Sequence, residues 1–240
     1  MPTHYSSPKQ LVLGISLRDE ATYRNFYCRE GSKNSEIVNI LKAQLSDSGE
    51  QIIYLWGAAG CGLTHLLQAA CHDAHERGIY AQYLPLKDLA GYAPDSIFEG
   101  LEAQDLVCVD SVDAVVGHSA WEKALFDFFN RMRDAGKRII FSSVASPNEL
   151  PMRLEDLKSR LAWSVIYHLE ELDDADKSAA LQMRAKSRGM DMQEEVAQYI
   201  LNRAPRDTND LFYILDSLDE LSLREQRKLT IPFVKEALGY

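Results

Sequence analysis

The sequence predicts an α/β protein in which a domain built on a mostly parallel, five-stranded sheet is followed by a small all-helical domain. Up to about residue 170, short apolar runs alternate with helical patterns, as in proteins made of βαβ units. Beyond that point the strand-like runs stop and only helical patterns follow. No internal repeat and no low-complexity linker interrupts this order.

The expected strands are short and mostly apolar, which is typical of strands covered by helices on both faces. The clearest helix between them spans residues 119–135, where Trp121, Leu125 and Phe128 recur at helical spacing and Gly136 supplies a stop. The strands are expected at residues 51–56, 79–84, 106–110, 138–143 and 164–169.

The second domain begins with a helix that Asp173 or Asp174 caps and Gly189 ends. Apolar residues at helical spacing predict further helices at residues 193–203, 209–221 and 231–238. The predicted organisation is therefore a tail over residues 1–20, an α/β domain over residues 21–170 and a helical domain over residues 171–240.

Composition and charge are those of a soluble globular protein of 240 residues, with 46% hydrophobic and 26% charged residues. The net charge of -10 disfavours a large contact with a phosphate backbone, which needs clustered Lys and Arg. Without an apolar leader or an apolar run long enough to span a bilayer, the chain is expected in the cytoplasm, with no membrane partner. The scattered cysteines predict neither zinc nor disulfides.

Residues 57–64 match the phosphate-loop pattern G-x-x-x-x-G-K-[ST] at every position but one, since Leu63 replaces the lysine. A strand leads into this segment and a helix over residues 64–77 follows it. Phosphate binding needs this context, because glycines let the backbone N–H groups curl around the anion and the helix start adds positive charge. An ordinary tight strand-to-helix turn is the alternative. The expected phosphate-site residues are Gly57, Ala58, Ala59, Gly60, Cys61, Gly62, Leu63, Thr64 and His65.

Asp110 ends a buried strand one strand and one helix after the loop, where a magnesium ligand is expected. The hydroxyl of Thr64 would bind the same ion. A hydrolytic enzyme usually has a second acid directly after the first, whereas this chain has Ser111, with Asp113 two residues further on. The missing lysine also removes a charge-assisted hydrogen bond worth roughly 1.5–3 kcal/mol. Binding of a diphosphate is therefore favoured over hydrolysis.

The order of these motifs resembles that of the AAA+ ATPases, specifically the family of the bacterial replication initiator DnaA. GCGLTHLLQAA resembles the initiator's loop and first helix with Leu63 as the departure, IIFSSVASPNEL its sensor 1 region, and LEDLKSRLAW its arginine-finger segment. The resemblance runs from about residue 25 to residue 221. It implies a three-layer AAA+ P-loop domain with a helical lid, holding ADP or another nucleoside diphosphate with Mg²⁺.

The resemblance also assigns roles to individual residues. It makes Arg160 an arginine finger that acts in trans and Arg206, in the segment Pro-Arg-Asp, a sensor 2 residue at the phosphates. Phe26 and Tyr27 lie where the family packs the base. Solvated cations for the arginines and ordinary core positions for the aromatic residues are the alternatives.

Within the family, the chain resembles the regulatory homologues that inactivate the initiator, because it ends in QRKLTIPFVKEAL without a helix-turn-helix domain. This resemblance implies two partners, DnaA, whose ATP hydrolysis the protein stimulates to prevent re-initiation, and the sliding clamp of DNA polymerase III. Gln10, Leu11 and Leu13 resemble the Q-L-x-L core of clamp-binding peptides, in which an extended segment fills a shallow apolar pocket. An edge strand is the alternative for these residues.

The leading hypothesis is thus a regulator with little hydrolytic activity of its own. One rival is an autonomous AAA+ ATPase with a degenerate phosphate loop, and another is a loader-type scaffold that does not depend on nucleotide. Direct, sequence-specific DNA binding is disfavoured by the acidic charge and the missing helix-turn-helix. The base of the nucleotide and a possible homo-oligomer stay open.

Overall fold

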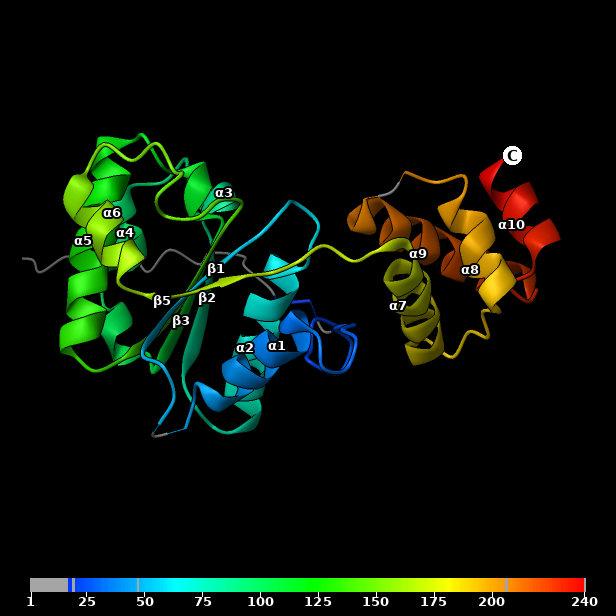
Figure 1. Cartoon of the computed structure of the whole chain (residues 1–240), viewed down its shortest axis with the longest axis horizontal. Helices are drawn as coiled ribbons and strands as arrows, with labels where there is room; N and C mark the ends of the chain where they lie inside the picture. The colour runs from blue at the N-terminus through cyan, green and yellow to red at the C-terminus, as the bar shows by residue number, and fades with distance from the viewer. Residues whose placement is uncertain (1–16, 19, 47, 206, 240) are drawn as a thin grey trace, which may run out of the picture.

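The computed structural model describes residues 17–18, 20–46, 48–205 and 207–239 and confirms the predicted fold class (Figure 1). Its described strands form one five-stranded sheet in the order β2-β3-β4-β1-β5, and every neighbouring pair is parallel. Strand β4 is central, and β1 lies between β4 and the edge strand β5. The strands are β1 (Ile52–Trp56), β2 (Ala81–Pro85), β3 (Leu106–Asp110), β4 (Arg138–Ser143) and β5 (Val165–His168).

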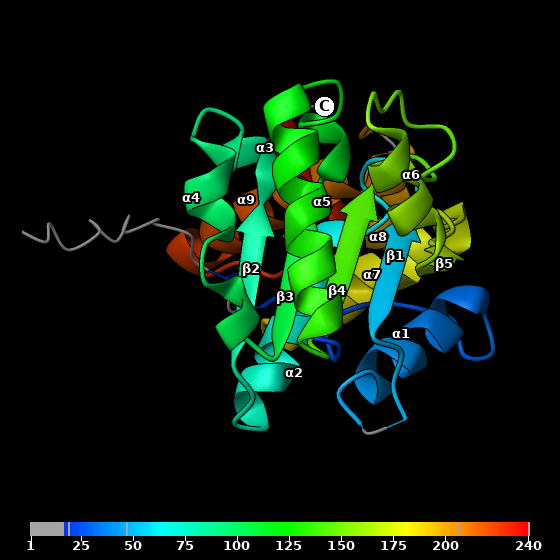
Figure 2. The same cartoon turned by 90° about the vertical axis from the view of Figure 1, so that its left-hand side faces the viewer.

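Two apolar clusters cover the two faces of the sheet and create the three layers. Because successive residues of a strand point to opposite faces, Tyr54 and Phe141 join one cluster while Ile53 and Ile140 join the other. Figure 2 shows α5 crossing the first face between α4 and α6. The helices of this domain are α1 (Lys33–Ala43), α2 (Leu63–Glu76), α3 (Leu86–Leu89), α4 (Pro94–Phe98), α5 (Ser119–Asp134) and α6 (Glu155–Ala162), with short 3-10 turns η1 (Leu101–Ala103) and η2 (Val112–Ala114).

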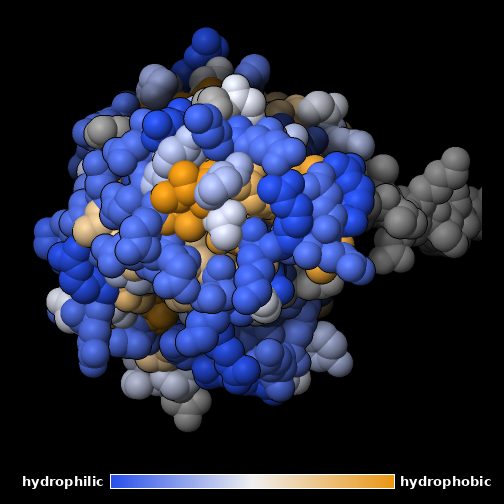
Figure 3. All heavy atoms as spheres, turned by 90° about the vertical axis from the view of Figure 1, so that its right-hand side faces the viewer, coloured by the Kyte–Doolittle hydropathy of each residue, from blue (hydrophilic) through white to orange (hydrophobic). Residues whose placement is uncertain are grey.

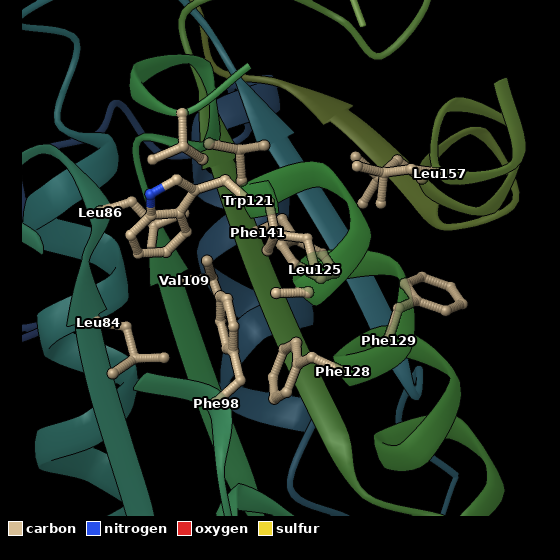
Figure 4. Close-up of a cluster of buried hydrophobic side chains, with 14 of the residues drawn as sticks. Leu84, Leu86, Phe98, Val109, Trp121, Leu125, Phe128, Phe129, Phe141 and Leu157 are labelled. Atoms are coloured by element: carbon tan, nitrogen blue, oxygen red, sulfur yellow. The ribbon is translucent and has the colours of Figure 1, made fainter. Parts of the chain in front are cut away.

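The cluster between α5 and the sheet is rich in aromatic side chains (Figure 4). Phe128 stacks on Phe98 of α4 with 4.8 Å between ring centroids, and Leu157 brings α6 into the same cluster. On the other face α1 and α2 supply the cover, with Leu66 and Leu67 of α2 fully buried. Helices α2 and α6 therefore lie on opposite faces of the sheet.

The lid has an apolar core of its own, built around Leu181, Ile200, Leu215 and Phe233. Figure 3 shows that its outer face is mainly hydrophilic, with a small apolar area near the middle. No helix in the described ranges is both long and apolar enough to cross a membrane. The lid helices are α7 (Asp174–Ser187), α8 (Glu194–Leu201), α9 (Thr208–Glu225) and α10 (Ile231–Leu238).

Residues 20–29 connect the two domains by polar contacts in addition to the chain itself. Glu20 accepts hydrogen bonds from Arg184 of α7 and from Arg188, the C-cap residue of that helix, the latter at 2.7 Å. Arg29 donates to Asp176 at the start of the same helix, at 2.8 Å. The segment that precedes α1 is thus bound to the lid.

Candidate nucleotide site

The loop between β1 and α2 has the backbone of a phosphate cradle. Gly60 and Gly62 have φ angles of +83° and +107°, in the left-handed region that glycine adopts without strain. A Cβ atom at Gly57 would lie 2.5 Å from the carbonyl oxygen of Leu169, so only glycine fits there. The loop ends at the first turn of α2, whose partial positive charge favours an anion.

Leu63, in the position of the missing lysine, is partly buried and packs against the apolar cluster between α2 and the sheet. The side chain that a P-loop protein would extend toward the phosphates instead helps to anchor the helix. At this loop, the groups suited to neutralise an anion are therefore the backbone N–H groups and the helix start.

Asp110 lies at the centre of a hydroxyl network. Its side chain is 4% exposed and accepts hydrogen bonds from Thr64 Oγ1 and the Tyr83 hydroxyl, each at 2.7 Å, and from the Ser142 hydroxyl. Thr64 and Asp110 are thus together, as the two hard oxygen donors of a magnesium site must be. These two side chains fit the ion by donor type.

Tyr83 and Ser142 were not among the predicted site residues. Burial raises the pKa of the Tyr83 phenol, and the adjacent charge of Asp110 raises it further, so the phenol stays protonated and donates. Nothing in the sequence pairs Tyr83 with Asp110, because their contact depends on the parallel register of β2 beside β3. Ser142 had a signal, since it lies next to the last residue of β4, in the segment that resembles sensor 1.

Asp113 is hydrogen-bonded to the end of β4. It accepts hydrogen bonds from the Ser143 hydroxyl at 3.0 Å and from the Val144 backbone N–H at 3.1 Å. Ser111, which precedes η2, has a φ of +60°, an uncommon value for a residue other than glycine. The acid nearest to Asp110 in sequence therefore fixes a turn of the chain.

The two aromatic residues expected at the base have different surroundings. Phe26 lies against the loop, because a Cβ atom at Gly62 would be 2.6 Å from its ring. Its ring centroid is 5.5 Å from that of His65, whose Nε2 donates to the carbonyl oxygen of Thr22 at 2.8 Å. Burial lowers the pKa of His65. Tyr27 instead donates a hydrogen bond to Asp176 of the lid.

The start of α9 closes over the loop. A Cβ atom at Gly60 would lie 2.7 Å from Asp207 Oδ2 and 3.3 Å from Asn209 Nδ2. Asp207 caps α9 by accepting a hydrogen bond from the backbone N–H of Asn209 at 2.8 Å. The sequence did not identify either residue as part of the site.

The predicted sensor 2 residue, Arg206, lies outside the described residues, as do Gln10, Leu11 and Leu13 of the predicted clamp-binding segment.

Arg160 lies in the last turn of α6, half-buried, with its guanidinium 4.6 Å from the ring centroid of Trp163. Trp163 is 72% exposed, which is unusual for so large an apolar side chain. Leu157 and Leu161 attach α6 to the cluster on the α5 face. The arginine is thus on a helix of the opposite face from the phosphate-loop helix α2.

Strand order, loop and lid together define a AAA+ protein of the P-loop class. The family model for the bacterial DnaA ATPase domain matches residues 17–168, and the chain belongs to that family. The model for the lid domain of Hda matches residues 174–238.

Solved structures agree with this assignment. Domain III of DnaA from Thermotoga maritima is 20% identical, with a TM-score of 0.78 over 94% of this chain and 98% of that one. AMPPCP-bound DnaA from Aquifex aeolicus is 25% identical, with a TM-score of 0.71 over 86% and 67% of the two chains. The Thermotoga maritima RuvB branch migration motor, at 13% identity and a TM-score of 0.60 over 85% and 67%, shares the fold.

Proposed function

We propose that this protein regulates the initiation of chromosomal replication by stimulating ATP hydrolysis on DnaA while holding a nucleoside diphosphate of its own. One observation carries the proposal: the phosphate loop keeps its Thr64–Asp110 pair, whereas Leu63 at the lysine position is partly buried and packs against the core. A DnaA-type domain with such a site is suited to bind nucleotide and poorly suited to hydrolyse it. The match of the lid to Hda supports a regulatory role.

The bound nucleotide is proposed to be ADP with Mg²⁺. The backbone of residues 57–62 would hold the diphosphate, and Phe26, which lies against Gly62, would pack beside the base. Magnesium, when bound, screens the phosphate charge, and Thr64 and Asp110 are the residues that would hold it. Asn209 of the lid lies close to Gly60 and would contact the phosphates, and the AMPPCP bound to DnaA from Aquifex aeolicus supports nucleotide binding.

The residue proposed to act on the partner is Arg160. A finger residue has to reach the nucleotide of a neighbouring subunit and stabilise charge that develops on the transferred phosphate. The position of α6 on the face opposite α2, and the exposed Trp163 beside the guanidinium, support contact with another protein. Docking on the sliding clamp through Gln10, Leu11 and Leu13 would raise the local concentration of the two proteins.

Arg160→Ala should reduce stimulation of DnaA hydrolysis by about 10³-fold or more, the usual contribution of an arginine finger. The measurement is phosphate release from ATP-bound DnaA with clamp loaded on DNA, as this protein is titrated in. Arg224→Ala is the matched control, since Arg224 is an exposed lid arginine. Normal stimulation by the Arg160 variant would exclude the finger.

Leu63→Lys should tighten ATP binding about tenfold and ADP binding less, because the ammonium reaches the β- and γ-phosphates. Isothermal titration of both nucleotides to the wild-type protein and the variant, with and without Mg²⁺, measures this. No heat with either nucleotide in the wild-type protein would favour the loader-type scaffold. Steady turnover by the purified chain without DnaA would favour the autonomous ATPase.

A further inference from the structure

The helix that carries Arg160 starts without a polar cap of its own. The N-cap residue of α6 is Leu154, whose side chain accepts no hydrogen bond. The cap is supplied from α5 by Glu122, which is 1% exposed. Its Oε2 accepts from the backbone N–H of Leu154 at 2.8 Å and from that of Arg153 at 3.0 Å. Its Oε1 accepts from Gly117 N–H at 2.7 Å.

A buried carboxylate is costly unless several donors surround it. Glu122 meets that condition with backbone N–H groups of the segments before α5 and before α6. Its negative charge at the start of α6 also interacts favourably with the helix dipole. These contacts fix both the height and the direction at which α6 leaves its loop.

From that fixed start the helix extends to Arg160 as one rigid unit. Arg160 is six positions after Leu154, which corresponds to a rise of about 9 Å along an α-helix. Leu157 and Leu161 hold one side of the helix against α5, and the guanidinium rests on Trp163. A tilt of α6 at its start therefore moves the guanidinium at its end.

We propose that Glu122 is a positioning residue for Arg160, which sets the finger at the partner's nucleotide by anchoring the start of α6. The proposal rests on the function proposed above for Arg160. In this proposal Glu122 contacts neither this protein's nucleotide nor the partner's, and it acts only through α6.

The test combines Glu122→Gln with Glu155→Gln as its matched control. The amide of Glu122→Gln replaces one acceptor oxygen with a donor that faces backbone N–H groups. Glu155→Gln makes the same chemical change at an exposed side chain in the first turn of α6. In the DnaA titration, Glu122→Gln should lower the plateau of stimulation about tenfold to a hundredfold, as a misplacement near 1 Å does. The half-maximal concentration should change less than about twofold. Glu155→Gln should leave both unchanged.

Two further results separate positioning from loss of folded protein. Glu122→Gln combined with Arg160→Ala should stimulate no less than Arg160→Ala alone, because both act on one group. If Glu122→Gln is poorly folded by circular dichroism, Glu122→Asp replaces it, since it keeps the charge and shortens the reach. A full plateau with the variant used, or additive losses in the double variant, would overturn the proposal.

A partner-independent measurement distinguishes this inference from the proposed function. In protein labelled with 5-fluorotryptophan, Glu122→Gln should shift or broaden the ¹⁹F resonance of Trp163 and leave that of Trp56 in place. Phenylalanine substitutions assign the signals. An unmoved Trp163 signal overturns the positioning role. If the Trp163 signal moves while Arg160→Ala stimulates normally, Glu122 still anchors α6 but Arg160 is not an arginine finger.

Discussion

Asp110 and Glu122 are both buried carboxylates, at 4% and 1% exposure, yet they are satisfied by different kinds of donor. Asp110 accepts from the hydroxyl groups of Thr64, Tyr83 and Ser142. A hydroxyl can turn about its C–O bond and give its hydrogen bond to another acceptor at little cost. The surroundings of Asp110 could therefore adjust to the cation and phosphate that we propose for this site.

Glu122 has no such freedom. Its donors are the backbone N–H groups of Gly117, Arg153 and Leu154, which cannot turn away unless the chain moves. The difference shows how two similar acids serve different purposes. Rotating donors suit a site that exchanges ligands, whereas backbone donors suit a joint between helices.

The largest expected effect on stability is at Glu122, which connects α5 to the start of α6. Glu122→Ala leaves buried N–H groups without an acceptor, at about 1–3 kcal/mol for each unmade bond. We expect a loss of about 3 kcal/mol in the free energy of unfolding, measured in urea and independent of added ADP. Glu155→Ala, with an exposed side chain on α6, is the control. A loss below about 1 kcal/mol would mean that water replaces the carboxylate and that the joint is not rigid.

Tyr83→Phe should have a smaller effect, because it removes one rotating donor and leaves Asp110 with others. A hydrogen bond to a charged group contributes about 1.5–3 kcal/mol, and reorientation of the Thr64 and Ser142 hydroxyls should reduce the net loss to about 1.5 kcal/mol. Unfolding in urea measures this loss, and titration with ADP should show affinity changed less than about threefold. Tyr80→Phe, at a 72% exposed tyrosine, is the control. A loss as large as that of Glu122→Ala would remove the distinction between the two acids.

The elements that sequence patterns predicted well are those that depend on local periodicity. The strands and the helix around Phe128 were predicted within one or two residues, since burial on both faces requires apolar runs and α5 needs one apolar stripe. The phosphate loop was visible because glycines must occupy fixed positions in it.

Side chains that enter a site from another element were not predictable. Tyr83 reaches Asp110 through strand register, Asn209 reaches Gly60 through the angle of the lid, and Glu122 reaches α6 from α5. Each of these contacts joins residues far apart in sequence, where no periodic pattern carries information. Tertiary packing alone determines them.

The smallest effect is expected at Glu20, an acid that is 39% exposed and bound by charged partners instead of hydroxyl or backbone groups. Burial by itself raises the pKa of Glu20, but the hydrogen bond from Arg188 and the charge of Arg184 outweigh it, so the pKa lies below its usual 4.5. A depressed pKa means that the ionised form stabilises the fold above about pH 4.5 and that this contribution is lost as the pH falls through the lower, folded-state value. Since water and salt screen the pair, Glu20→Gln should cost less than about 1 kcal/mol at pH 7.

The difference between wild type and Glu20→Gln, measured by urea unfolding from pH 7 to pH 3, should stay constant near neutrality and shrink in acid. It should also shrink in 1 M NaCl, where the Debye length is about 3 Å. Glu30→Gln, at an exposed acid directly after this segment, controls for the change in net charge. A difference that persists at pH 3 would show that Glu20 acts through packing. The contact of Glu20 with the lid would then resemble the buried contact of Glu122 with α6 more than a surface ion pair.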